Sequence, residues 1–275
     1  MRRLTLDEIR KIQLEILDTV MDFCAERGIN CWLNGGTLLG AVRHKGYIPW
    51  DDDIDLGMLR PDYDRFMAEF NGYNPRYEFR SIENDPECEF AFGKVFDNTT
   101  VVDEPLTNIT GMALNVDIFV MDNAPDDDRI VRDMFRKRIA YIRAVRCIRE
   151  GIFPARWSIM SIKRRICVAA CRIAWKIVHF FPPKSARFDY IRKIAENSKR
   201  YADKKTARVG DFVGWHCLVC RRELLENLTE LEFEGKMYKV PAGYDEWLRG
   251  LYGDYMTPPP PGKRISHQLI AYKKD

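Results

Sequence analysis

The chain contains 275 residues, which is enough for one large domain with its own hydrophobic core. Its composition of 46% hydrophobic and 31% charged residues, with a net charge of +3, excludes the disordered and collagen-like classes. The sequence has no uncharged apolar stretch of about 18 residues and no signal-peptide core at its start, so it predicts a cytoplasmic protein without a membrane-spanning helix.

The first predicted elements are a long helix, a short strand and a short helix. Thr5 and Glu8 have the spacing of a capping box, and apolar residues then recur every three or four positions until Gly28. A short strand is expected at 30–34, and a short helix at 38–42.

Two glycines, Gly35 and Gly36, stand with Thr37 between this strand and this helix. Glycines allow backbone N–H groups to come close to a phosphate at a helix N-terminus. The segment is not a P-loop, because no Gly-Lys-Ser/Thr follows, and it lacks the dinucleotide-binding spacing. It is a candidate phosphate contact, although most Gly-Gly pairs are only turns.

An acidic strand is expected at 51–58. Side chains alternate between the faces of a strand, so Asp51, Asp53 and Asp55 would share one face while apolar side chains occupy the other. Carboxylates at this spacing can hold Mg²⁺ or Mn²⁺ between them. The alternative is a solvated acidic turn, which would not need apolar residues at alternate positions.

Further strands are expected at 77–82, 90–97, 100–103 and 112–121. Asp117 lies in the middle of the last of these, among apolar residues. A charge in such a strand is costly unless it is paired or bound to a metal. The sequence therefore favours a third carboxylate of one metal site, and the alternative is a buried salt bridge to an arginine.

The chain is expected to form a catalytic core over 1–125, a basic helical region over 126–205 and a C-terminal segment over 206–275 that returns to the core. Residues 129–187 contain 16 Lys or Arg and two acidic residues, a charge of +14, so the remainder carries −11. Helices are expected at 126–149, 157–181 and 185–203, strands at 207–214 and 229–240, and a final helix at 244–252.

The predicted helix 157–181 is amphipathic and contains no acidic residue. Isoleucines form a stripe along it, and Arg164, Arg165, Arg172 and Lys176 gather opposite. One interpretation is peripheral contact with the inner face of an anionic membrane. The other is a helix that packs its stripe against the helix 126–149 and shows its basic face to solvent or to an anionic glycan.

The eight cysteines do not indicate a disulfide framework in a chain of this length. Cys217 and Cys220 form one Cys-x-x-Cys pair, whereas a structural zinc site normally needs a second pair at similar spacing. Buried thiols are the favoured interpretation, and a zinc site is the alternative.

The order of these motifs resembles the nucleotidyltransferase superfamily of the polymerase-β kind. The segment LNGGTLLGAVRHKGYIPWDDDIDLGM is similar to one branch of it, the LicD family, which has the fukutin-related proteins as relatives. Further matches are Lys94 in FGKVFDNTT, Asp117 in NVDIFVMD, and the tail FEGKMYKVPAGYDEWLRGLYGDYMTPP. The resemblance covers residues 1–125 and about 230–267, and it leaves the basic helical region uncovered.

The resemblance implies an α/β fold of the nucleotidyltransferase kind, a mixed sheet flanked by helices with a basic helical insertion. LicD members are described as transferring phosphocholine, or a related phospho-alcohol, from a CDP-activated donor to a hydroxyl of a cell-surface glycan. Lipopolysaccharide and teichoic acid are glycans of this class, and the acceptor can be lipid-linked. No nucleic-acid partner is expected.

This chemistry implies two Mg²⁺ or Mn²⁺ ions, because charge must be neutralised on both the entering and the leaving oxygen. Asp53 and Asp55 are implied as metal ligands, Asp117 as a ligand and the general base, and Asp51 as a further candidate ligand. The candidate contacts for the donor phosphates are Gly35, Gly36, Thr37, Arg43, Lys45 and Lys94.

Two other functions remain open from the sequence. A nucleotidyltransferase could add NMP from an NTP to RNA or protein on the same fold, and the chain could instead be a non-catalytic glycan-binding scaffold. The aromatic residues Tyr47 and Trp50 flank the acidic strand and could face a quaternary ammonium group, although either can be a core residue.

Overall fold

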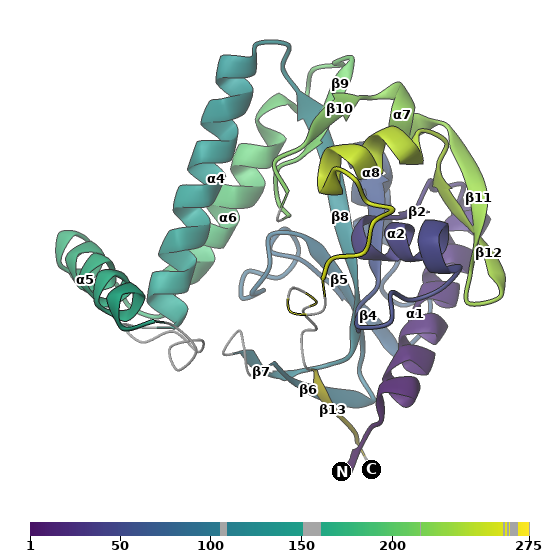
Figure 1. Ribbon diagram of the computed structural model, residues 1–275, viewed down its shortest axis with the longest axis horizontal. Helices are drawn as coiled ribbons and strands as arrows, with labels where there is room; N and C mark the ends of the chain where they lie inside the picture. The colour runs from purple at the N-terminus through teal and green to yellow at the C-terminus, as the bar shows by residue number, and fades with distance from the viewer. Residues whose placement is uncertain are drawn as a thin grey trace.

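The computed structural model describes residues 1–104, 109–150, 161–214, 216–260, 262, 264 and 269–274. These residues form an α/β fold, in which helices lie around a mixed sheet of seven strands (Figure 1). A four-stranded antiparallel sheet and a two-stranded hairpin lie at its margins. The predicted fold class is confirmed.

The seven-stranded sheet is built around its longest strand, β8. Its members are β2 (Trp32–Leu33), β3 (Asp55–Leu59), β4 (Tyr77–Arg80), β5 (Gly93–Asp97), β8 (Asn115–Ala124), β9 (Arg208–Asp211) and β10 (Val219–Arg221). One edge of β8 pairs with β3 in parallel, and the other pairs first with β5 and then with β9, both antiparallel. The chain thus returns to the sheet at β9, after the helices that follow β8.

The other elements surround this sheet. The small antiparallel sheet contains β1 (Arg2–Arg3), β13 (Ile270–Lys273), β6 (Thr100–Glu104) and β7 (Ile109–Met112), and the hairpin contains β11 (Leu228–Phe233) and β12 (Lys236–Pro241). The helices are α1 (Leu6–Arg27), α2 (Gly35–His44), α3 (Arg60–Glu69), α4 (Asp128–Arg149), α5 (Ile162–Val178), α6 (Ala186–Ser198), the 3-10 turn η2 (Lys199–Tyr201), α7 (Glu223–Glu226) and α8 (Tyr244–Tyr252). None of the helices in the described ranges is long and apolar enough to cross a membrane.

Several predicted elements are confirmed to the residue. Thr5 and Glu8 form both hydrogen bonds of the capping box at the start of α1, and Gly28 ends that helix in the left-handed conformation. The helix predicted at 244–252 is α8. The apolar stripe of α1 is buried as its spacing predicts, because it packs against the sheet and α3.

Several predicted boundaries are wrong, and two of them lie beside the acidic segment. The second helix begins at Gly35 instead of residue 38, so the two glycines form its first turn. The acidic strand begins at Asp55 instead of Asp51. Side chains of α1 replace the expected strand hydrogen bonds upstream of Asp55: the Arg10 guanidinium donates to the Asp51 carbonyl at 2.7 Å, and the Gln13 amide donates to the Asp52 carbonyl at 2.9 Å.

The three helices of the basic region lie on one side of the molecule (Figure 1). α4 and α6 pack side by side, whereas α5 projects beyond the end of α4 at the margin of the fold. The apolar stripe of α5 faces outward: Ile162, Ile166, Ile173 and Ile177 are 73%, 66%, 42% and 58% exposed. The interpretation that this stripe packs against helix 126–149 is therefore wrong, because α5 uses its other side for that contact.

A buried ionic cluster joins α3, β8 and α6. The Arg60 guanidinium donates two hydrogen bonds to the Asp122 carboxylate, at 2.7 and 2.8 Å, and a third to Glu83 at 2.9 Å. The Ser198 hydroxyl also donates to Asp122. Burial alone would lower the pKa of Arg60, but the Asp122 and Glu83 carboxylates raise it, so the guanidinium stays charged.

Candidate active site

A cavity of about 730 Å³ lies over one end of the large sheet. Its lining includes seven of the residues that the sequence singles out: Gly35, Gly36, Asp51, Asp53, Asp55, Lys94 and Asp117. These residues come from α2, the segment before β3, and three neighbouring strands. The fold therefore brings together side chains that are up to 82 positions apart in the sequence.

A row of charged residues crosses the floor of this cavity. Asp55 on β3 lies directly opposite Asp117 on β8, and Asp117 lies opposite Lys94 on β5. The Lys94 ammonium forms an ion pair with the Asp117 carboxylate and donates to the Asn115 side-chain oxygen at 3.0 Å. The sequence left open a buried salt bridge from Asp117 to an arginine; the structure has a salt bridge to a lysine. Asp117 also lines the same cavity as the other carboxylates.

The first turn of α2 packs directly against two of the carboxylates. The Gly36 N–H donates to Asp55 Oδ2 at 3.2 Å, and the Thr37 hydroxyl accepts from the Asp55 N–H at 2.8 Å. In this structure both groups therefore hold Asp55, and their predicted contact with a donor phosphate stays a prediction. Their contribution is to fix the Asp55 carboxylate between α2 and β3.

The close approach requires glycine at both positions. A side chain at Gly35 would collide with the Asp55 carboxylate, and a Cβ at Gly36 would lie 2.8 Å from Asp51 Oδ2. Gly35 also has a φ of +51°, in the left-handed region that disfavours other residues.

We expect Gly35→Ala to lower activity by at least about tenfold, because displacing a catalytic group by about 1 Å can cost about a hundredfold. Gly28→Ala is the matched control, since Gly28 has a φ of +61° and nothing within 4 Å of its added Cβ. Steady-state kinetics and thermal melting of both variants measure the effect. If they lose activity equally, backbone strain alone explains the loss, and the proposed packing against Asp55 is wrong.

The carboxylates make the cavity floor strongly negative. Asp55 is partly exposed to the cavity, but burial of its carboxyl raises its pKa well above the usual value, and the charges of Asp53, Asp117 and Asp51 raise it further. The hydrogen bond from Gly36 acts in the opposite direction. Burial and the charges of Asp55, Asp51 and Asp53 also raise the pKa of Tyr252, which lines the same cavity. Such a floor attracts cations.

The aspartates of the cavity floor could bind a hard divalent cation. Carboxylate oxygens are the ligands that Mg²⁺ and Mn²⁺ prefer, and a cation would relieve the repulsion that raises the Asp55 pKa. In the part of the chain that the structure describes, no three carboxylate, imidazole or thiol groups are close enough together to form a ready-made metal site. Metal binding would therefore require small shifts of these side chains, including the Lys94–Asp117 pair.

The raised pKa of Asp55 has a consequence for stability. A carboxyl whose folded pKa lies above its unfolded value binds more protons in the folded state, so it destabilises the fold as the pH rises through that pKa. We expect Asp55→Asn to raise the Tm of the metal-free protein at pH 7 by about 2–4 °C, the shift that about 1 kcal/mol produces in a chain of this size.

The Tm difference between Asp55→Asn and wild type should shrink as the pH falls toward about 4, where an unperturbed carboxyl is half protonated. Addition of Mg²⁺ should raise the Tm of the wild type more than that of the variant. Thermal melts over a pH series measure both effects. A variant less stable than wild type at neutral pH without metal would contradict the electrostatic account.

The structure does not bring two of the predicted phosphate contacts into the cavity. The Arg43 guanidinium donates to the Tyr255 carbonyl at 2.8 Å, and Lys45 pairs with Glu232 at 3.0 Å on the surface. Lys45 ends α2 in the left-handed conformation, which turns the following loop toward the hairpin β11–β12. Both cations therefore hold the α2 end in place, and Lys94 is the predicted cation that lies in the cavity.

The zinc interpretation of Cys217 and Cys220 receives no support from the described residues. Cys217 accepts a hydrogen bond from the Arg138 guanidinium at 3.0 Å, and burial raises the pKa of the Cys220 thiol to about 12. Among the described residues, no group of three His, Cys, Asp or Glu side chains that could hold a metal ion is present.

Other cavity residues were missed by sequence reasoning. The wall formed by α8 includes Trp247 and Tyr252, and the Trp247 indole donates to the Asn34 side chain at 2.9 Å, just before α2. Both residues lie in the C-terminal segment that resembles the LicD family, and this resemblance could have indicated that they belong to the site. The aromatic lining comes from these residues and from phenylalanines near β5, whereas Tyr47 is buried against Phe233 and donates to Gln13.

The basic helical region forms the remaining wall. Four arginines of α4 and α5 line the cavity: Arg146, Arg149, Arg164 and Arg172. Arg149 pairs with Glu89 at 2.7 Å, and Arg172 pairs with Glu150 at 2.8 Å. Arginines of the basic helical region and the aspartates of the floor therefore line the same cavity. The sequence, in which these two regions are separate segments, did not predict that they meet.

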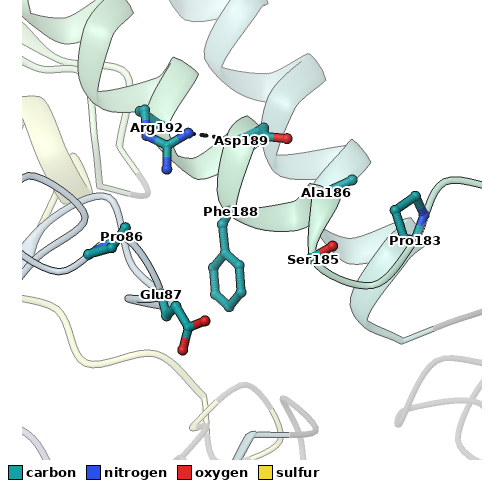
Figure 2. A pocket seen from close by; sticks show the side chains of 8 residues that line it. All are labelled: Pro86, Glu87, Pro183, Ser185, Ala186, Phe188, Asp189 and Arg192. Carbon is teal, nitrogen blue, oxygen red and sulfur yellow. Dashed lines mark hydrogen bonds and ion pairs between the residues drawn. The ribbon is translucent and has the colours of Figure 1, made fainter.

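A second, shallower hollow of about 390 Å³ lies between Pro86–Glu87 and the start of α6 (Figure 2). The Phe188 ring extends between the two segments, and Asp189 pairs with Arg192 at 3.0 Å. None of the sequence-predicted site residues lines it. The chemistry is therefore assigned to the large cavity.

The comparisons with known proteins identify one family. Residues 28–154 match the family described as LicD/FKTN/FKRP, nucleotidyltransferase domain. The lipopolysaccharide cholinephosphotransferase LicD of Haemophilus influenzae is 32% identical over 276 aligned positions, which cover 98% of each chain. The human ribitol 5-phosphate transferase FKRP is 57% identical over 35 residues, 13% of this chain and 7% of the relative. The mouse ribitol-5-phosphate transferase FKTN is 33% identical over 84 residues, 30% of this chain and 18% of the relative.

Proposed function

Because this chain belongs to the LicD family of phosphotransferases, we propose that it transfers phosphocholine, or a related phospho-alcohol, from a CDP-activated donor to a hydroxyl of a cell-surface glycan. The observation that carries this proposal is the row formed by Asp55, Asp117 and Lys94 on the cavity floor, beside Asp51 and Asp53. The printed activities of the relatives, transfer of cholinephosphate and of ribitol 5-phosphate, support the substrate class.

We assign Asp53, Asp55 and Asp117 as ligands of Mg²⁺ or Mn²⁺, with Asp51 as a further ligand. Bound there, two such ions would neutralise charge on the oxygens that enter and leave the transferred phosphorus. The raised pKa of Asp55 and the four carboxylates around one cavity support this assignment. Gly36 and Thr37 hold Asp55 in place through its carboxylate and its N–H.

Asp117 is the general base in this mechanism. It accepts the proton of the acceptor hydroxyl as that oxygen attacks the phosphorus next to the alcohol of the donor. A new oxygen–phosphorus bond forms, the bond from that phosphorus to the bridging oxygen breaks, and CMP leaves with the bonding electrons. Lys94 orients Asp117 through their ion pair. Its positive charge would then stabilise the reacting phosphate.

The test measures CMP release from CDP-choline, CDP-ethanolamine, CDP-ribitol and CDP-glycerol, with a lipopolysaccharide acceptor and with Mg²⁺ or Mn²⁺. We expect one donor to be used, and EDTA to abolish its turnover. Pyrophosphate release from an NTP, with no CMP from any donor, would instead identify a nucleotidyltransferase. Binding of glycan without turnover of any donor would identify a scaffold.

A further inference from the structure

The outer face of α5 is an apolar surface on an otherwise charged region. Half of the large apolar side chains that are exposed among the described residues lie within residues 162–181. They are Ile162, Ile166, Ile173, Ile177, Val178, Phe180 and Phe181. We call these seven residues the α5 apolar face. Exposed apolar groups so concentrated mark an interaction surface in a folded protein.

The protein uses the opposite side of α5 for its own contacts. Arg172 is only 11% exposed and pairs with Glu150 at the end of α4, and the Trp175 ring lies 6.2 Å from Tyr190 of α6. The charged and aromatic side of the helix therefore faces the body, and Arg164 and Arg172 line the cavity. A helix that packs into a core buries its apolar stripe. Here the stripe is left exposed, as the exposed fractions of the α5 apolar face show.

The end of α5 adds two exposed aromatic rings. Phe180 and Phe181 have φ angles of 52° and 49°, in the left-handed region that residues other than glycine rarely adopt. Their N–H groups close the helix by donating to the Ile177 and Lys176 carbonyls. The backbone of these two residues is therefore strained. Their side chains are exposed, Phe180 to 92% and Phe181 to 67%.

We propose that the α5 apolar face docks on the surface of an anionic lipid bilayer. The charge of α5 selects this partner: the helix has no acidic residue, and its Lys163 and Arg164 are exposed. An anionic leaflet attracts such a helix while its isoleucines and phenylalanines enter the acyl boundary. A second copy of the chain would bring an equally cationic helix against it. Docked in this way, α5 places the arginine-lined wall of the cavity next to the membrane surface.

The test is sedimentation of the full-length protein with vesicles of phosphatidylcholine containing phosphatidylglycerol, compared with pure phosphatidylcholine. We expect binding to the anionic vesicles that weakens at high salt. Ile166→Glu with Ile177→Glu should lower the partition coefficient by at least about a hundredfold, about tenfold for each apolar side chain replaced. The matched control is Met237→Glu with Met256→Glu, which changes side chains of similar exposure, 57% and 53%, outside the helical region.

Equal binding of the two double variants, or no binding of the wild type to anionic vesicles, would overturn the proposal. So would a wild-type dimer in sedimentation velocity that the Ile166→Glu, Ile177→Glu variant abolishes, because a second copy would then occupy the face. The proposal does not rest on the donor chemistry: vesicle binding is measured without substrate, and turnover on a soluble acceptor is measured without vesicles.

Discussion

We expect replacement of Asp117 with asparagine to lower the rate of CMP release by at least about 10³-fold, because the variant would lose the proposed general base and a proposed metal ligand together. Asparagine keeps the shape of the side chain, so β8 and its pairing with β3 and β5 should persist. Asp203→Asn, at an exposed turn after η2, is the matched control and should retain full activity. Initial rates at saturating donor, with a thermal melt of each variant, measure the effect.

A second comparison tests whether Asp117 and Lys94 act as one unit. Their ion pair predicts that Lys94→Met combined with Asp117→Asn is little worse than Asp117→Asn alone, because residues that act together are not additive. Additive losses would mean that Lys94 acts on the substrate independently of Asp117. Retention of more than about a tenth of the wild-type rate in Asp117→Asn would contradict its role as base, since a positioned base contributes at least about a hundredfold.

Asp122→Ala destabilises the fold by about 3–5 kcal/mol, the cost of removing one partner from a buried ion pair. The change leaves the Arg60 guanidinium, which is only 4% exposed, without its bidentate partner between α3 and β8. The Ser198 hydroxyl of α6 loses its acceptor in the same cluster. Since three elements meet there, the loss should affect the whole cooperative unit.

Urea denaturation of Asp122→Ala and wild type measures this difference. Asp133→Ala is the control, because Asp133 also pairs with two cations, Lys137 and Arg200, but lies on the surface. Exposed pairs contribute little, so the control should unfold at the wild-type urea concentration. If both variants unfold at the same concentration, the buried cluster does not stabilise the fold.

The sequence predicted best where local patterns decide the structure. The capping box at Thr5, the stop at Gly28 and the final helix at 244–252 depend on neighbouring residues, and the structure has all three. Asp51, Asp53 and Asp55 were singled out because their spacing places them on one face of a strand, opposite apolar residues, and Asp117 because it lies within an apolar strand. Their meeting in one cavity follows from the register of β3, β5 and β8, which sequence spacing does not contain.

The predictions that went wrong depended on contacts between distant residues. Asp51 and Asp52 are not in a strand, and their carbonyl groups accept hydrogen bonds from Arg10 and Gln13 of α1. Lys45 pairs with Glu232, 187 positions later in the chain, and so lies away from the cavity. The amphipathic pattern of α5 identified an apolar stripe correctly but could not tell which side of the helix would face the protein.

The most direct test of the central claim follows the transferred phosphate. CDP-choline labelled with radioactive phosphorus in the phosphate attached to choline is incubated with the enzyme, Mg²⁺ and a lipopolysaccharide acceptor. The account predicts that the label appears in the glycan while the released CMP is unlabelled, and that neither product forms with Asp117→Asn. Label released as free phosphocholine, with cytidine phosphate attached to the acceptor, would contradict it.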